Sequence, residues 1–135
     1  MNATLCLVVY MAIVTWLTLL AASVIRARGW TLSGMKIAAG NRDVLPEATP
    51  FSGRAERTAR NTLEGFVLFT AIALVAQTAG VTHPNVAAGA ELFFWARIVY
   101  IPVYYAGIAY LRTGVWLVSI LGLAMMAIAV LQAEI

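Results

Sequence analysis

Four long apolar segments constrain the fold of this chain more than any other feature. They hold almost no charged residues and cover positions 5–25, 65–90, 92–111 and 113–133. At about 1.5 Å per residue, each is long enough to cross a hydrocarbon core of about 30 Å. Hydrophobic residues make up 62% of the 135 positions and charged residues only 11%, which is outside the range of ordinary soluble domains. The sequence therefore predicts an integral membrane protein.

We predict an all-α fold in which a single domain, residues 1–135, forms a four-helix membrane bundle. One substantial loop covers residues 26–52, and the four spans cover approximately residues 5–25, 60–81, 86–111 and 113–133. Glycine, proline and asparagine residues argue against a long helix in this loop, although residues 31–39 could form a short helix along the membrane surface.

Basic residues are concentrated at one end of the predicted bundle. The loop and the first turns of the following helix hold seven of the nine basic residues, namely Arg26, Arg28, Lys36, Arg42, Arg54, Arg57 and Arg60. The positive-inside rule therefore predicts a cytoplasmic loop, with both termini outside. A cleavable signal peptide is the alternative for the first span, but residues 1–4 contain no basic residue and the apolar run is too long for one.

The helix that follows the loop carries one polar face. At 100° per residue, Arg54, Arg57, Arg60, Asn61 and Glu64 share an arc of about 120°. Lipid offers these groups no hydrogen-bond partner, so one another, a partner helix or a bound polar ligand must satisfy them. Arg54 and Arg60 are alternatively anchors whose long side chains reach the membrane interface.

A second polar stripe follows the span predicted over residues 86–111. With Arg97 at zero, Tyr100 lies at about −60°, Tyr104 at about −20° and Arg112 at about +60°. We expect Glu64 to form an ion pair with Arg97 if the two helices are antiparallel. Alternatively, this pair fixes the register of the helices and has no role in ligand binding. However, the two faces hold more guanidiniums than carboxylates, which favours an anionic ligand.

These residues together resemble the MAPEG group, the membrane-associated proteins in eicosanoid and glutathione metabolism. The sequence looks most like the bacterial branch of the group, which implies the bacterial inner membrane as its location. The resemblance covers almost the whole chain and rests on Gly40-Asn41-Arg42-Asp43, on Gly53-Arg54-Ala55-Glu56-Arg57 followed by Arg60-Asn61 and Glu64, and on Ala96-Arg97 with Tyr100 and Tyr104.

The resemblance implies a homotrimer of four-helix subunits with glutathione, as cosubstrate, bound between neighbouring subunits. Expected partners are further copies of the chain, membrane lipids and a lipophilic small-molecule substrate, and no nucleic acid. Arg26 or Arg28 would reach in from the adjacent subunit. The candidate substrate-binding residues are Arg26, Arg28, Arg57, Arg60, Asn61, Glu64, Arg97, Tyr100 and Tyr104.

An arginine near the cytoplasmic end stabilises the glutathione thiolate in enzymes of the family, and Arg112 is the candidate for this catalytic role. Residues 113–118 contain no second arginine, unlike some members, and Arg112 is alternatively a positive-inside anchor. His83 is the single histidine, so a histidine-based metal site or a serine-histidine dyad has no support and no metal is expected.

The resemblance implies a glutathione-dependent transferase or peroxidase that acts on lipophilic electrophiles or lipid hydroperoxides. The alternative is a non-enzymatic membrane protein of the same fold that binds an anionic metabolite or a lipid headgroup.

Overall fold

The computed structural model describes residues 1–133, which form four long helices and one short helix and contain no strand. The long helices are α1 (Ala3–Ala27), α3 (Pro50–Thr78), α4 (Pro84–Ala106) and α5 (Ala109–Gln132), and the short one is α2 (Leu32–Ala39). All four long helices are long and apolar enough to cross a membrane. The prediction of an all-α, four-span fold is confirmed.

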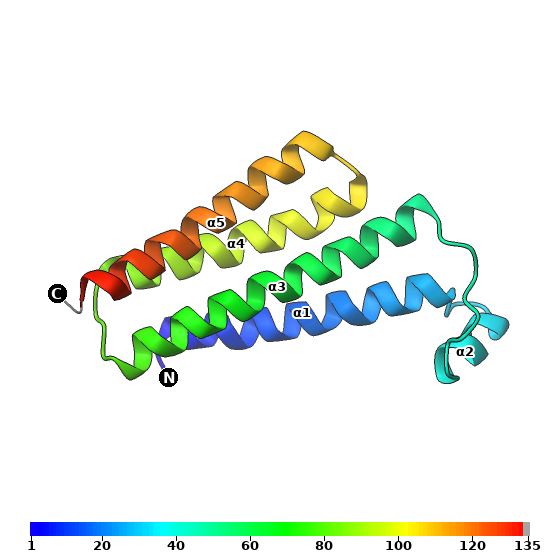
Figure 1. Ribbon diagram of the computed structural model, residues 1–135, viewed down its shortest axis with the longest axis horizontal. Coiled ribbons are helices and arrows are strands. Elements are labelled where there is room, and N and C mark those ends of the chain that lie inside the picture. Colours follow the sequence, from blue (N-terminus) through cyan, green and yellow to red (C-terminus); the bar gives the residue numbers. More distant parts are fainter. Residues whose placement is uncertain (134–135) are drawn as a thin grey trace.

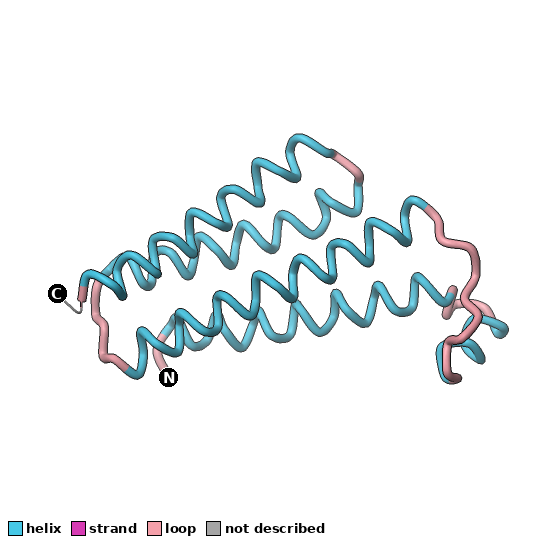
Figure 2. The backbone as a smooth tube through the Cα atoms, in the orientation of Figure 1, coloured by secondary structure: helices cyan, strands magenta, loops and turns pink. Residues whose placement is uncertain are grey.

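Successive long helices run in opposite directions along one bundle (Figure 1). Both ends of the described chain and the turn between α3 and α4 lie at one end of the bundle. The other end holds α2, the segment 40–49 and the short turn between α4 and α5, and we call it the loop end. Figure 2 shows that segment 40–49 is the longest connection without secondary structure.

Side-chain caps explain where helices α2 and α3 begin. Thr49 Oγ1 accepts a hydrogen bond from the Ser52 backbone N–H at 3.1 Å, and Ser52 Oγ accepts one from the Thr49 N–H at 2.9 Å. This capping box and Pro50 in the first turn start α3 before its first arginine. Thr31 Oγ1 caps α2 in the same way by accepting from the Gly34 N–H at 2.9 Å. The short helix predicted over residues 31–39 is confirmed.

Helix α4 ends at Ala106, so the prediction of one span over residues 86–111 is wrong. Gly107 adopts a left-handed conformation, with φ 77°, and its backbone N–H bonds to the carbonyls of Tyr104 and Val103. Arg112 therefore lies on α5 and does not continue the helical stripe of Arg97, as the sequence pattern suggested. The pattern failed because apolar residues continue through the turn and only the glycine marks it.

The larger of two apolar core clusters lies in the half of the bundle away from the loop end. Phe69 of α3 and Phe93 of α4 stack there with ring centroids 4.6 Å apart, and both are buried. Helices α4 and α5 approach closely where Gly89 faces Gly122, because a Cβ on Gly89 would lie only 2.6 Å from the Gly122 carbonyl oxygen. These contacts position the α4–α5 pair against α3.

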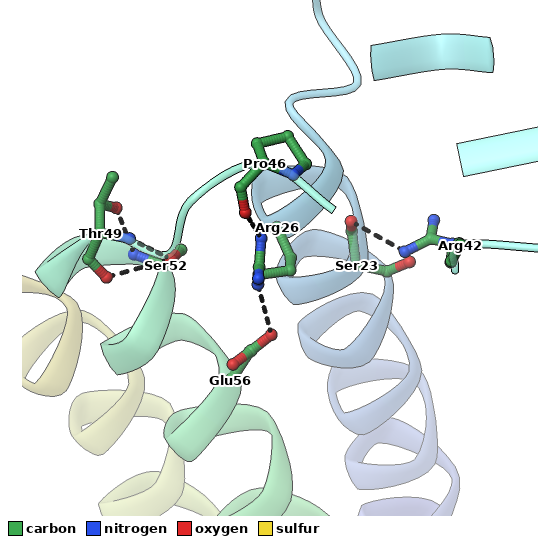
Figure 3. A network of polar contacts seen from close by, with 7 residues as sticks. All are labelled: Ser23, Arg26, Arg42, Pro46, Thr49, Ser52 and Glu56. Carbon is green, nitrogen blue, oxygen red and sulfur yellow. Dashed lines mark hydrogen bonds and ion pairs between the residues drawn. The ribbon is translucent and has the colours of Figure 1, made fainter. Parts of the chain in front are cut away.

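Polar contacts tie segment 40–49 to the adjacent helices (Figure 3). Arg26, near the end of α1, donates to the Pro46 carbonyl and pairs with Glu56 of α3 at 3.5 Å. Arg42 Nη1 donates to the Ser23 carbonyl of α1 at 3.4 Å. The loop is thus fastened to both α1 and α3.

Candidate functional site

Polar side chains from three helices gather in the loop-end half of the bundle. They line, or lie next to, two adjoining cavities. The residues are Arg57, Asn61 and Glu64 from α3, Arg97, Tyr100 and Tyr104 from α4, and Arg112 from α5.

Arg97 is the centre of this cluster and is only 1% exposed. Its Nη1 donates to Asn61 Oδ1 at 2.9 Å and its Nη2 donates to Thr62 Oγ1 at 3.2 Å. The guanidinium also lies 4.1 Å from the centroid of the Tyr100 ring, within the range of a cation–π contact. Two neutral acceptors and one aromatic face therefore hold the buried cation.

The predicted ion pair between Glu64 and Arg97 is wrong. Arg26 and Glu56 form the single ion pair within residues 1–133. Glu64 is exposed in the single chain, so its carboxylate avoids the cost of desolvation, while Asn61 and Thr62 occupy the terminal nitrogens of Arg97. The carboxylate of Glu64 therefore stays unpaired among the described residues, at the edge of the cavity that Arg97 and Phe93 also line.

Two tyrosines link the three guanidiniums. Tyr100 and Tyr104 make an edge-to-face contact with centroids 5.5 Å apart. Tyr104 Oη accepts a hydrogen bond from Arg57 Nε at 3.0 Å, and the Arg112 guanidinium lies 4.8 Å from the Tyr104 ring centroid. Positive charge is thereby held at several points along one wall of the site.

The two cavities differ in character. The one of about 270 Å³ is lined by Asn61, Tyr100, Arg112, Thr113 and Trp116, all of which carry a polar group. The other, of about 140 Å³, has Glu64 and Arg97 on its wall, and the rest is mainly apolar, including Leu68, Phe93, Ile120 and Leu123. Asn61 and Trp116 line both cavities, so the two are neighbours, and together they are called the α3–α5 groove below.

One donor of Arg97 has no partner. Its Nε is buried and makes no hydrogen bond within residues 1–133, although both terminal nitrogens do. Buried polar groups in folded proteins are rarely unpaired, because each such group loses its bonds to water. Arg97 lines the apolar cavity, whereas its Nε has almost no accessible surface.

A family model describes almost the whole chain. The model of the MAPEG family matches residues 3–132. The chain belongs to the MAPEG family. Members of this family include glutathione transferases and peroxidases. Together with the four apolar helices, the match identifies an integral membrane protein. Searches of curated proteins and of solved structures gave no match.

Three predicted site residues of this MAPEG chain, Arg26, Arg28 and Arg60, do not line the α3–α5 groove, and neither does Arg54. Arg26 and Arg28 line a separate pocket with Trp30, between the end of α1 and the start of α3. Arg60 is exposed and makes no side-chain hydrogen bond or ion pair with the rest of residues 1–133. Arg54 Nε donates to the Tyr105 carbonyl at 3.1 Å and so ties α3 to the end of α4. One chain thus brings together seven of the ten predicted site residues and leaves Arg26, Arg28 and Arg60 outside.

Sequence reasoning missed three residues at the MAPEG site. Thr62 accepts from Arg97 but lies outside the polar arc of α3, so no pattern pointed to it. Thr113 Oγ1 lies 3.5 Å from Arg112 Nη2 and directly follows it in sequence. Trp116 follows Arg112 by four positions, which is the spacing of neighbours on one helix face, so this signal was available.

Proposed function

We propose that this MAPEG protein is a glutathione-dependent membrane transferase or peroxidase that acts on lipophilic electrophiles or lipid hydroperoxides. One observation carries the proposal: a cavity lined by Asn61, Tyr100, Arg112 and Thr113 adjoins a mainly apolar cavity that has Glu64 and Arg97 on its wall. A polar thiol and an apolar substrate can therefore meet where the two cavities join, beside Asn61 and Trp116.

The polar groups suit the charges of glutathione. At neutral pH this tripeptide carries two carboxylates and one ammonium group. Guanidiniums of Arg57 and Arg97 match the two carboxylates, and the exposed carboxylate of Glu64 matches the ammonium. The surplus of positive over negative side chains favours such a ligand, whose net charge is negative.

Arg112 is the proposed catalytic residue. It lines the polar cavity and is held against the Tyr104 ring, so its positive charge is available to stabilise a glutathione thiolate. In the transferase reaction the thiolate forms a C–S bond and the leaving group departs with its electron pair. In the peroxidase reaction the thiolate attacks a peroxide oxygen, which gives an alcohol and a sulfenic acid. A second glutathione then reduces the sulfenic acid to yield disulfide and water.

We further propose that the protein is a homotrimer in the bacterial inner membrane with its loop end in the cytoplasm. Glutathione then enters from the aqueous side, and the lipophilic substrate enters from the bilayer. Arg26 or Arg28, which lie away from the groove of their own chain, would reach the glutathione of an adjacent subunit. Glu64 at the groove edge is exposed in the single chain, which leaves room for such a neighbour.

The test uses purified protein in detergent. Glutathione binding is measured by calorimetry, and turnover is measured as conjugation to chlorodinitrobenzene and as reduction of cumene hydroperoxide. The wild type should bind and turn over, whereas Arg112→Ala should retain binding and lose most turnover. Lys36→Ala, which changes a basic residue outside the groove, should behave like the wild type. Binding without turnover by the wild type supports the non-enzymatic alternative, and absence of both overturns the proposal.

A further inference from the structure

Helix α2 leaves an apolar face without a partner. At 100° per residue, Leu32, Met35, Lys36 and Ala39 share an arc of about 100°, and all four are exposed. We call this arc the outer face of α2. Leu32 is 72% exposed and Met35 is 57% exposed, while Leu17 on the first membrane span is 50% exposed. Leu32 and Met35 are thus at least as exposed as Leu17, a residue of a membrane-spanning helix.

Close backbone packing fixes which way this face points. Gly34 lies on the opposite side of α2 and is buried. A Cβ at this position would be 1.8 Å from the Arg28 carbonyl oxygen, so the helix is pressed against the end of α1. Among the helices of residues 1–133, α2 contacts α1 alone. The outer face is therefore turned away from the bundle.

The position of α2 along the bundle matches the boundary of a bilayer. Helix α1 has 25 residues. At about 1.5 Å per residue it is about 37 Å long, which exceeds a hydrocarbon core of about 30 Å. Its last turn consequently reaches the headgroup layer, and α2 begins only five residues after α1 ends. In Figure 1, α2 lies beside the end of α1 and extends outward from the bundle.

The residue types also fit a lipid interface. Lys36 belongs to the outer face, and its chain is long enough to keep the ammonium among phosphates while Leu32 and Met35 enter the acyl region. Trp30, which is 67% exposed, precedes the helix, and tryptophan is enriched at this depth. The segment from Arg26 to Thr49 has four basic and two acidic residues, a net positive charge that complements acidic lipid.

We propose that the outer face of α2 inserts into the headgroup–acyl boundary of the phospholipid leaflet at the loop end. Leu32 and Met35 supply the buried apolar surface, and Lys36 binds lipid phosphate. Because Arg42 and Arg26 fasten the following segment to α1 and α3, this insertion fixes the depth of the whole connection between those helices. The inference is independent of glutathione binding, which involves the α3–α5 groove.

Site-directed spin labelling of the full chain tests this proposal. In a Cys6→Ser background, single cysteines are introduced by Leu32→Cys, Met35→Cys or Ser33→Cys and labelled. Ser33 is the matched control, because it is exposed on α2 but lies about 100° away from Leu32. Each protein is reconstituted in vesicles of phosphatidylcholine with a minority of phosphatidylglycerol. Collisions with oxygen, which partitions into lipid, and with a water-soluble nickel complex are then compared.

Labels at positions 32 and 35 should collide several-fold more with oxygen than with nickel, whereas a label at position 33 should favour nickel. Leu17→Cys on the first span provides the reference for a lipid-facing site. Equal nickel access at 32, 35 and 33 would overturn the proposal, because the outer face would then be in water. Low access of both reagents at 32 and 35 would also overturn it, since a second copy of the chain would then cover the face.

Discussion

The two halves of the bundle are built from the same helices but differ in what they bury. Away from the loop end, Phe69 stacks on Phe93 and glycines bring α4 and α5 together. In the loop-end half, Arg97 is buried with neutral acceptors around it. The change occurs within one helical turn of α4, because Phe93 and Arg97 are four residues apart. The apolar half holds the bundle together, and the polar half is available for a ligand.

The largest effect is expected from overpacking the apolar half. Gly122→Leu adds a side chain whose Cβ would lie 2.7 Å from both the Gly89 carbonyl oxygen and the Phe93 backbone nitrogen. Helices α4 and α5 must then separate, at a cost of at least about 1–3 kcal/mol. We expect little folded protein by size-exclusion chromatography and thermal unfolding in detergent.

Gly114→Leu is the matched control for that substitution. Gly114 lies on the same helix, but nothing lies within 4 Å of a Cβ built there. This variant should unfold at the wild-type temperature. Equal losses for both variants would show that any leucine on α5 is harmful, which would contradict the role assigned to the Gly89–Gly122 contact.

Arg97→Met separates stability from binding in the polar half. The change removes two hydrogen bonds and a cation–π contact but also removes a buried charge, so the free energy of unfolding should change by less than about 1 kcal/mol. Glutathione affinity should fall about 10- to 100-fold, because a bond from a charged donor is worth about 1.5–3 kcal/mol. Calorimetry and thermal unfolding measure the two effects. A large loss of stability with unchanged affinity would make Arg97 a structural residue.

Glu64→Gln tests the ammonium-binding role with a smaller change. The carboxylate is exposed, so stability should not change, whereas glutathione affinity should fall about tenfold. Glu91→Gln is the control, because Glu91 is also exposed but lies near the start of α4, in the apolar half. If both variants bind glutathione with wild-type affinity, Glu64 does not contact the ligand.

The smallest effect is expected from Tyr104→Phe. This variant removes the acceptor of the Arg57 Nε hydrogen bond and keeps the ring that contacts Arg112. The Arg57 side chain then loses one of its contacts, and the binding free energy of glutathione should weaken by about 0.5–1.5 kcal/mol. Tyr110→Phe, at a tyrosine that is 96% exposed, should bind like the wild type. An equal loss in both variants would contradict the role of the Tyr104 hydroxyl.

The sequence predicted four spans, a short helix at residues 31–39 and the two polar faces, because apolar runs and helical angles are local properties. It placed the start of the second span near residue 60, whereas α3 begins at Pro50. Contacts between helices were harder to predict. A helical angle indicates the face on which Arg97 lies, but it does not decide whether Asn61, Thr62 or Glu64 becomes its partner. The competition between burial and hydrogen bonding decides that, and it depends on the packed geometry. The turn at Gly107, which moves Arg112 to α5, was hidden within an apolar run.

Glutathione binding in the α3–α5 groove is measured by calorimetric titration. Glutathione is titrated into the wild type and into an Arg57→Gln, Glu64→Gln double variant in the same detergent. A Lys36→Gln, Glu91→Gln double variant, which changes the same charges outside the groove, serves as the control. We predict saturable binding to the wild type and the control, and binding at least about tenfold weaker to the groove variant. Absence of binding to the wild type, or equal affinity in all three proteins, would contradict this account.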